Sequence, residues 1–283
     1  MIKFSLPGFF ENYPTLIQFY DYYKQHPDHF YDDRIIDSFY GADESLIWRG
    51  GRNIIAPYRN NLDKLFESRK DFPNVKIRHT FTNCLITEQI LNDYLCNQFI
   101  SKYIEPGDEV ILNHPLLIQY FKEHYPTIPI IYSTTLDIND IDKINKITET
   151  NLYVINYNYN NDDEYLSKLK HPENVELICS EPCKENCPVR KNHYLTISKE
   201  ILNISLNEDD LPGCPYICSQ LTFYEIMQRK HAITNERLKE LEKHGFQYYK
   251  ISGRGIPPYL WIDTMLYYLA KPEYIDYIRE VLL

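Results

Sequence analysis

The sequence predicts an α/β fold of the TIM type, a (β/α)8 barrel that is either complete or has an irregular eighth unit. Short apolar runs alternate with amphipathic stretches along most of the 283-residue chain, and seven of these runs are typical of strands. Repeated strand–helix units at this spacing favour a parallel sheet with helices outside it. Seven strands suit a barrel better than a short open sheet.

The predicted strands are short and separated by helices. The strands cover Ile35–Tyr40, Val75–Thr82, Glu109–Leu112, Pro129–Ser133, Leu152–Asn156, Val175–Cys179 and Tyr248–Ile251. The helices cover Arg59–Lys70, Glu88–Ile104, Pro115–His124, Ile138–Ile147, Asp162–Lys170, Thr222–Lys230, Asn235–His244, Tyr259–Leu269 and Glu273–Leu282. No linker, low-complexity tract or repeat divides the chain, so we expect one barrel domain over residues 1–283.

Composition excludes several classes of function. A hydrophobic share of 43% and a charged share of 25% are ordinary for a globular protein in water. The formal charge of −10 argues against nucleic acid as a partner. No glycine-rich loop follows a predicted strand, which argues against a dinucleotide or P-loop site. We expect a cytoplasmic protein, because the sequence shows neither a membrane span nor the pattern of a secretory signal.

Five of the seven cysteines lie in one stretch, about residues 179–218, which we expect to form a loop at the carboxyl-terminal mouth of the barrel. Cys179, Cys183 and Cys187 are each separated by three residues, and Cys214 and Cys218 follow. In a reducing cytoplasm, close cysteines point to metal ligation or redox chemistry more than to structural disulfides.

The type and spacing of these ligands favour an iron–sulfur cluster. Gaps of three residues differ from the two-residue knuckles of zinc ribbons, and two equal gaps do not fit the radical-SAM pattern. Thiolate-only ligation with irregular spacing and a distant fourth cysteine suits an iron–sulfur cluster, with Cys214 as the distant ligand and Cys179 or Cys218 in the remaining place. The alternatives are a zinc site, for which His193 is a further candidate ligand, and unligated thiols.

Polar residues follow most of the predicted strands, where the chemistry of a parallel barrel is found. For the serines, threonines and asparagines among them, capping of the next helix explains the pattern equally well. That explanation is weaker for His79, His114, Lys250 and Arg254. We expect His79 and His114 to be acid–base groups and Lys250 and Arg254 to hold a carboxylate or phosphate. The alternative for the two cations is an ion pair with a barrel carboxylate such as Asp37 or Glu181.

Two stretches carry a resemblance to a known family. The first, residues 176–194, joins a strand to three of the cysteines, and the second, Gly245-Phe-Gln-Tyr-Tyr-Lys-Ile-Ser-Gly-Arg254, precedes a tyrosine-rich helix. Together they resemble the collagenase-like peptidases of family U32, in which the late strand reads Lys-Ile-Glu-Gly-Arg. Here Ser252 replaces the glutamate. The likeness extends from about residue 34 to the end of the chain.

The resemblance implies a TIM-type barrel with a 4Fe–4S cluster held by four cysteines. Cys183, Cys187 and Cys214 match the family pattern best, and the fourth ligand is Cys179 or Cys218. Several relatives act in oxygen-independent hydroxylation of ubiquinone precursors or of RNA pyrimidines. This chain is shorter than the long members, and together with its charge of −10 this argues against an RNA substrate.

Three functional hypotheses follow. The first is an iron–sulfur oxidoreductase, hydroxylase-like, acting on a small or aromatic substrate at the barrel mouth. The second is a peptidase, although the sequence has no His-Glu-x-x-His or Gly-x-Ser-x-Gly motif. The third is a non-catalytic or redox-sensing subunit with a structural cluster and a protein partner, since some relatives are heterodimers. The loop Trp48–Arg52 is then a partner contact or a lid, or an ordinary surface turn.

Overall fold

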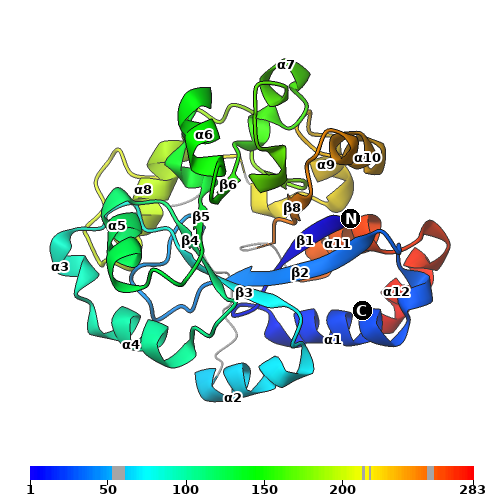
Figure 1. The fold of residues 1–283 in the computed structure, drawn as a ribbon, viewed down its shortest axis with the longest axis horizontal. Helices are drawn as coiled ribbons and strands as arrows, with labels where there is room; N and C mark the ends of the chain where they lie inside the picture. Colours follow the sequence, from blue (N-terminus) through cyan, green and yellow to red (C-terminus); the bar gives the residue numbers. More distant parts are fainter. Residues whose placement is uncertain (53–60, 212–213, 217, 254–257) are drawn as a thin grey trace.

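The computed structural model describes residues 1–52, 61–211, 214–216, 218–253 and 258–283. Eight strands close into a barrel in chain order, each pair of neighbours is parallel, and β1 also pairs with β8. The predicted TIM-type barrel is therefore confirmed, with the helices arranged around the strands (Figure 1). Within the described ranges, no helix has the length and apolar character needed to cross a membrane.

Seven of the strands were predicted, and the eighth is at the amino terminus. The strands are β1 (Ile2–Pro7), β2 (Arg34–Gly41), β3 (Lys76–Phe81), β4 (Glu109–Leu112), β5 (Ile130–Tyr132), β6 (Leu152–Val154), β7 (Val175–Ile178) and β8 (Tyr248–Lys250). Strand β1 alternates strictly: Phe4 and Leu6 belong to the outer hydrophobic core, whereas Lys3 and Ser5 make polar contacts with side chains of β7 and β8. This strand closes the barrel.

The helices confirm most of the predicted segments and add two. They are α1 (Tyr13–Gln25), α2 (Leu62–Glu67), α3 (Glu88–Leu91), α4 (Tyr94–Tyr103), α5 (Pro115–His124), α6 (Ile141–Thr148), α7 (Asp163–Leu166), α8 (Arg190–Ile201), α9 (Phe223–Met227), α10 (Asn235–Lys243), α11 (Pro258–Leu269) and α12 (Ile275–Leu282). Helices α1 and α8 were not predicted. The single helix expected over Glu88–Ile104 is two helices, because the Asp93 side chain caps α4 by accepting from the Cys96 amide at 2.8 Å. The start of the helix expected from Arg59 lies outside the described residues.

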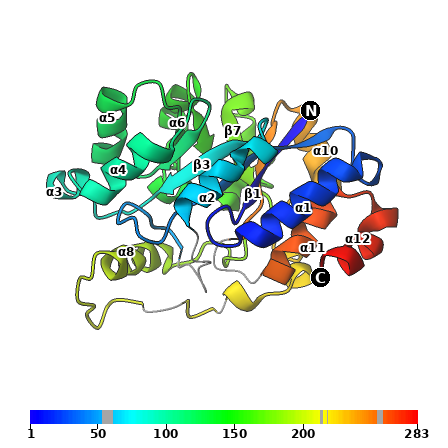
Figure 2. The ribbon, with the colours of Figure 1, turned by 90° about the horizontal axis from the view of Figure 1, so that it is seen from below.

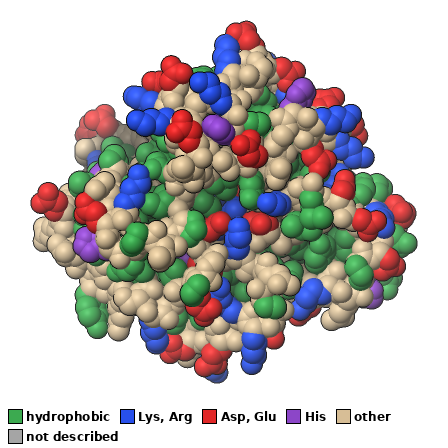
Figure 3. Space-filling model, viewed as in Figure 1, with side chains coloured by type: hydrophobic (Ala, Val, Ile, Leu, Met, Phe, Trp, Pro, Cys, Tyr) green, Lys and Arg blue, Asp and Glu red, His purple; other side chains and the backbone are tan. Residues whose placement is uncertain are grey.

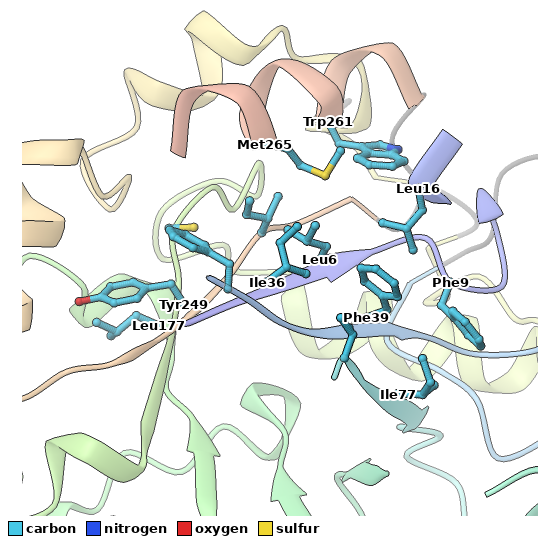
Figure 4. Close-up of a cluster of buried hydrophobic side chains, with 14 of the residues drawn as sticks. Leu6, Phe9, Leu16, Ile36, Phe39, Ile77, Leu177, Tyr249, Trp261 and Met265 are labelled. Atoms are coloured by element: carbon cyan, nitrogen blue, oxygen red, sulfur yellow. The ribbon is translucent and has the colours of Figure 1, made fainter. Parts of the chain in front are cut away.

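The main hydrophobic core lies between the outer faces of the strands and the helices. Figure 4 shows Trp261 and Met265 projecting from α11 toward Leu6 of β1 and Ile36 of β2. These four side chains are at most 6% exposed. Burial of such apolar area is the main force that holds the helices on the barrel.

Charged side chains fill the amino-terminal half of the barrel interior. Arg78, fully buried, donates to Glu176 at 2.5 Å, to Glu109 at 2.6 Å and to Asp37 at 3.2 Å. Figure 3, which views this end, shows basic and acidic side chains gathered at its centre. A second buried apolar cluster, which includes Tyr40, lies inside the barrel.

Candidate functional site

A small pocket lies at the carboxyl ends of the strands and encloses about 60 Å³. Helix α8 crosses this end of the molecule, opposite the amino terminus (Figure 2), and contributes Tyr194 to the wall. The lining side chains come from most of the strand ends and from two loops. They are Tyr40, Gly51, Arg52, Thr80, Thr82, Ile111, Ser133, Thr134, Thr135, Val154, Ile178, Glu181, Tyr194, Lys250, Ser252 and Gly253.

The loop that ends at Arg52 is part of the pocket wall. The Trp48 carbonyl accepts from the Asn83 amide at 2.9 Å, and the indole of Trp48 donates to a backbone carbonyl at 2.8 Å. A Cβ on Gly50 would clash with the carbonyl of Thr82, so only glycine allows this approach to the end of β3. The loop therefore holds Arg52 against the pocket, a placement that its sequence did not reveal.

Glu181 is the carboxylate of the pocket, and its oxygens are fully engaged. It forms an ion pair with Arg52, accepts from the Cys183 amide at 3.1 Å and accepts from the Ser252 hydroxyl at 3.2 Å. Burial by itself would raise the pKa of Glu181, but the positive charge of Arg52 outweighs burial and lowers that pKa to about 2. Glu181 is thus an ionised group that neutralises Arg52.

Beside this ion pair, Cys218 interacts with two of the other clustered cysteines. The thiols of Cys183 and Cys218 share a hydrogen bond, and Cys218 also interacts with Cys214. The hydrogen bond from Cys183 is the main reason that the pKa of Cys218 falls to about 6. Arg52 lies 3.6 Å from the Cys183 sulfur. All of these cysteines are free thiols, and among the described residues no three potential ligands are already placed around a metal position.

Cys179 and Cys187 are placed differently. Cys179 is fully buried in the outer core, where its thiol donates to the Lys250 carbonyl at 3.2 Å and burial raises its pKa. Of the two candidates for the remaining place, the structure thus brings Cys218, and not Cys179, to Cys183. Cys187 lies in the loop before α8, and its carbonyl accepts from the amide of Arg190, the first residue of that helix, at 3.3 Å.

The structure does not bring the two candidate histidines to the pocket. His79 lies on the outer face of β3, 1% exposed, with its ring stacked on Phe66 and its Nε2 3.5 Å from Asp108. His114 caps α5, where its Nδ1 accepts from the Leu116 amide at 3.3 Å, and burial lowers its pKa. His114 therefore caps a helix, the explanation that was weaker for a histidine than for a serine, threonine or asparagine.

Lys250 lies where it was expected. It lines the pocket, and its Nζ is 3.6 Å from the centre of the Tyr40 ring. Glu181, considered as an ion-pair partner for the late cations, forms an ion pair with Arg52. Arg254 lies outside the described residues.

Helix α8 supplies two candidate functional residues, Arg190 and Tyr194, that the sequence did not reveal. Arg190 donates to the Tyr194 hydroxyl at 2.9 Å and to the Thr134 hydroxyl at 3.1 Å, and its guanidinium lies 4.7 Å from the Tyr157 ring centre. The buried residues of α8 include arginine, threonine and serine, so the helix lacks the apolar period that would have predicted it.

Comparison with known proteins supports the fold. No family model and no curated protein matches the chain. A solved structure, that of the U32 peptidase Mk0906, matches with a TM-score of 0.55 over 89% of this chain and 94% of that chain, at 14% identity. The chain has the fold of a U32 peptidase. The fold implied by the sequence resemblance is therefore confirmed, and the likeness, at this identity, concerns the fold alone.

Proposed function

We propose that this chain binds a 4Fe–4S cluster at the barrel mouth and is an iron–sulfur oxidoreductase, hydroxylase-like, for a small or aromatic substrate. The observation that carries the proposal is the interaction of the Cys218 thiol with the thiols of both Cys183 and Cys214, beside the mouth pocket. Arg52 joins the two features, because it lines the pocket and reaches the Cys183 sulfur.

The donor set suits the cluster in chemical type. Cys183, Cys214 and Cys218 would hold it, together with Cys187, which lies four residues after Cys183 in the same loop. Thiolates are the ligands that iron–sulfur clusters use. Since no ready metal site exists among the described residues, the two cysteine loops would complete their arrangement around the iron. When bound, such a cluster donates or accepts single electrons.

The residues around the thiols have roles of their own. Glu181 accepts from the Cys183 amide and so fixes the start of the cysteine loop. Arg52 donates toward the Cys183 sulfur, which stabilises negative charge there; hydrogen bonds to ligating sulfurs tune reduction potentials. Tyr194 closes one side of the pocket and is held by Arg190.

The open pocket supports a catalytic role over a purely structural one, because a structural cluster needs no cavity beside it. A peptidase is less well supported. In the described part of the chain, the hydrogen bonds of the histidines go to tyrosine, carboxylate and backbone groups, and none joins a histidine to a serine or cysteine nucleophile.

The decisive experiment is spectroscopy and metal analysis of anaerobically purified protein. We expect a brown protein with a broad band near about 400 nm and about four irons and four sulfides per chain. Bleaching by dithionite and recovery on reoxidation would support an electron-transfer role. A colourless protein with one zinc per chain would overturn the proposal, and a cluster that resists reduction would indicate a structural role.

A further inference from the structure

We infer that the mouth pocket binds the carboxamide group of a small uncharged molecule, with Tyr194 donating to its carbonyl oxygen and Thr80 and Thr82 accepting from its N–H groups. This inference names the substrate class of the site proposed above and rests on that proposal for its catalytic meaning. Three features of the pocket support it: polar groups with unused hydrogen-bonding capacity, charged groups that already have partners, and the small size of the cavity.

Two buried hydroxyls of the pocket have no hydrogen-bond partner. Thr80 and Thr82 line the pocket and are 2% and 3% exposed. Neither Oγ1 is paired among the residues that the structure describes. Buried polar side-chain atoms in proteins are paired in the large majority of cases, so a ligand or water occupies the space in front of these two hydroxyls. Each hydroxyl can donate and accept.

Tyr194 presents a donor to the same pocket. Its hydroxyl accepts from Nε of Arg190 at 2.9 Å, and in the described part of the chain it donates to no other group. Burial raises the pKa of this hydroxyl, which also lies in the field of Arg52 and Glu181 of the pocket wall. The hydroxyl therefore keeps its proton at neutral pH and requires an acceptor on the ligand.

The charged side chains of the pocket wall already have partners. Among the lining residues that the structure describes, they are Arg52, Glu181 and Lys250. Arg52 and Glu181 form an ion pair, and the Lys250 ammonium lies 3.6 Å from the centre of the Tyr40 ring in a cation–π contact. An anionic ligand would have to displace one of these contacts, whereas an uncharged ligand leaves them in place. The wall therefore favours an uncharged ligand, since burial of a charge without its own counter-charge is costly.

A carboxamide matches the three hydroxyls in number and type. Its carbonyl oxygen accepts, as Tyr194 requires, and its two N–H groups donate to two hydroxyl oxygens. Thr80 ends the inner face of β3 and Thr82 follows two residues later, a separation of about 6.6 Å along a strand. Hydrogen bonds of about 2.9 Å from both sides leave room for one small group between them. A ketone lacks the N–H donors, and a carboxylate carries a charge.

The cavity is small and partly apolar. It encloses about 60 Å³, and one water needs about 10–15 Å³ of such volume, so about four to six atoms of that size fit. Ile111, Val154 and Ile178 line it and belong to the buried apolar cluster inside the barrel. A carboxamide with a short apolar end fills this space, with its polar atoms at the hydroxyls and its carbon atoms against the three apolar side chains.

Ligand-observed NMR titration of the full chain tests the inference with acetamide, acetate, acetone and 2-propanol. These probes have nearly the same size and differ in charge and in hydrogen-bonding groups, and each gives a methyl signal. We expect saturable binding of acetamide with a Kd of about 1 mM. Each of the other three should bind at least about tenfold more weakly, because it loses a hydrogen bond or adds a charge.

Substitutions assign each end of the probe to its partner. Tyr194→Phe removes the donor to the carbonyl oxygen and should weaken both acetamide and acetone about tenfold. Thr80→Val and Thr82→Val remove acceptors of the N–H groups, so each should weaken acetamide about tenfold and leave acetone unchanged. Valine and phenylalanine keep the shape of the side chains they replace, and melting temperatures verify that the three variants fold.

Two buried hydroxyls outside the pocket provide matched controls. Thr264 of α11 donates to the Leu260 carbonyl at 3.4 Å, and Tyr153 of β6 donates to the Ile138 carbonyl at 3.3 Å. Thr264→Val and Tyr153→Phe should leave the affinity for acetamide unchanged.

Three results would overturn the inference. They are no saturable binding of acetamide, which would leave water as the occupant of the pocket; equal or tighter binding of another probe; or unchanged acetamide affinity in Tyr194→Phe and both threonine variants. Iron is measured on the same samples. A colourless protein that binds acetamide would support the carboxamide site and overturn the cluster. A brown protein that binds no acetamide would overturn the carboxamide site and leave the cluster standing.

Discussion

The hydroxyl of Ser252 donates to Oε2 of Glu181 at 3.2 Å, across the ends of β8 and β7. In the family that the sequence resembles, the late strand has a glutamate where this chain has Ser252. The structure places a carboxylate next to that serine, but from the loop after the neighbouring strand. Glu181, in the loop after β7, therefore places a negative charge beside Ser252, which follows β8.

This hydrogen bond predicts the effect of moving the carboxylate from position 181 to position 252. Glu181→Gln leaves the Arg52 cation without its counter-charge and should lower the free energy of unfolding by about 2–3 kcal/mol. The value is below that of a fully buried pair, because Arg52 is 25% exposed. Adding Ser252→Glu should restore most of the loss. Urea denaturation measures both effects, and a double variant no more stable than the single one would contradict the interpretation.

A second prediction concerns which thiols hold iron. Cys183→Ser and Cys218→Ser should each lose most of the iron and sulfide of the anaerobic protein, because their thiols meet in the structure. Cys179→Ser should keep its iron, because that thiol lies in the outer core. Cys96→Ser, at a fully buried site on α4, is the control for lost stability alone. Iron loss in Cys179→Ser with iron retained in Cys218→Ser would reverse the assignment.

The charge network inside the barrel predicts a large loss of stability. Arg78→Met leaves Glu176, Glu109 and Asp37 without their shared cation and should cost about 3–5 kcal/mol at neutral pH. Lys76→Met, at a side chain 38% exposed in the same network, should cost less than about 1 kcal/mol. Denaturant midpoints of the two variants measure this difference, and equal midpoints would show that Arg78 is not central to the network.

Asp108 predicts a pH-dependent contribution to stability. Burial raises its pKa, but hydrogen bonds from His79 and Arg69 outweigh burial and hold the pKa below its ordinary 3.8. Because the folded state lowers this pKa, the stabilisation is complete above about pH 5 and is lost as the pH falls through the folded value. Asp108→Asn should therefore be less stable than the native protein by about 3 kcal/mol at pH 7, and the gap should narrow toward pH 3.

Urea denaturation at pH 7, 5 and 3.5 measures that gap. Glu105→Gln is the control, because its carboxylate is 56% exposed while pairing with the same Arg69. A gap between Asp108→Asn and the native protein that is constant with pH would contradict the account.

Gly50 predicts a steric effect at the pocket wall. Gly50→Ala places a Cβ against the Thr82 carbonyl and should cost about 1–3 kcal/mol while displacing the Arg52 loop. Gly107→Ala meets no atom within 4 Å and should cost only the strain of its backbone, whose φ is +99°, about 1 kcal/mol. Thermal unfolding gives the two costs. Equal costs for the two substitutions would contradict this steric account.

The sequence by itself determined the class of fold and showed where the cysteines are concentrated. Alternation of apolar strands and amphipathic helices is a local pattern, so it predicted seven strands and the barrel, and α5 with its observed bounds. The concentration of cysteines between 179 and 218 was equally visible. Helices α1 and α8 were not predicted. Helix α8 buries polar side chains, which carry no periodic hydrophobic signal.

Only the tertiary structure decided which side chains meet. The register of a strand fixes which face points into the barrel, and that register turns His79 toward the helices and Thr80 toward the pocket. Arg52 and Glu181 are 129 positions apart in the sequence, yet they form an ion pair in the pocket wall. Such pairings arise from closure of the barrel by β1 and β8, because local sequence patterns set each element but not the neighbours it will contact.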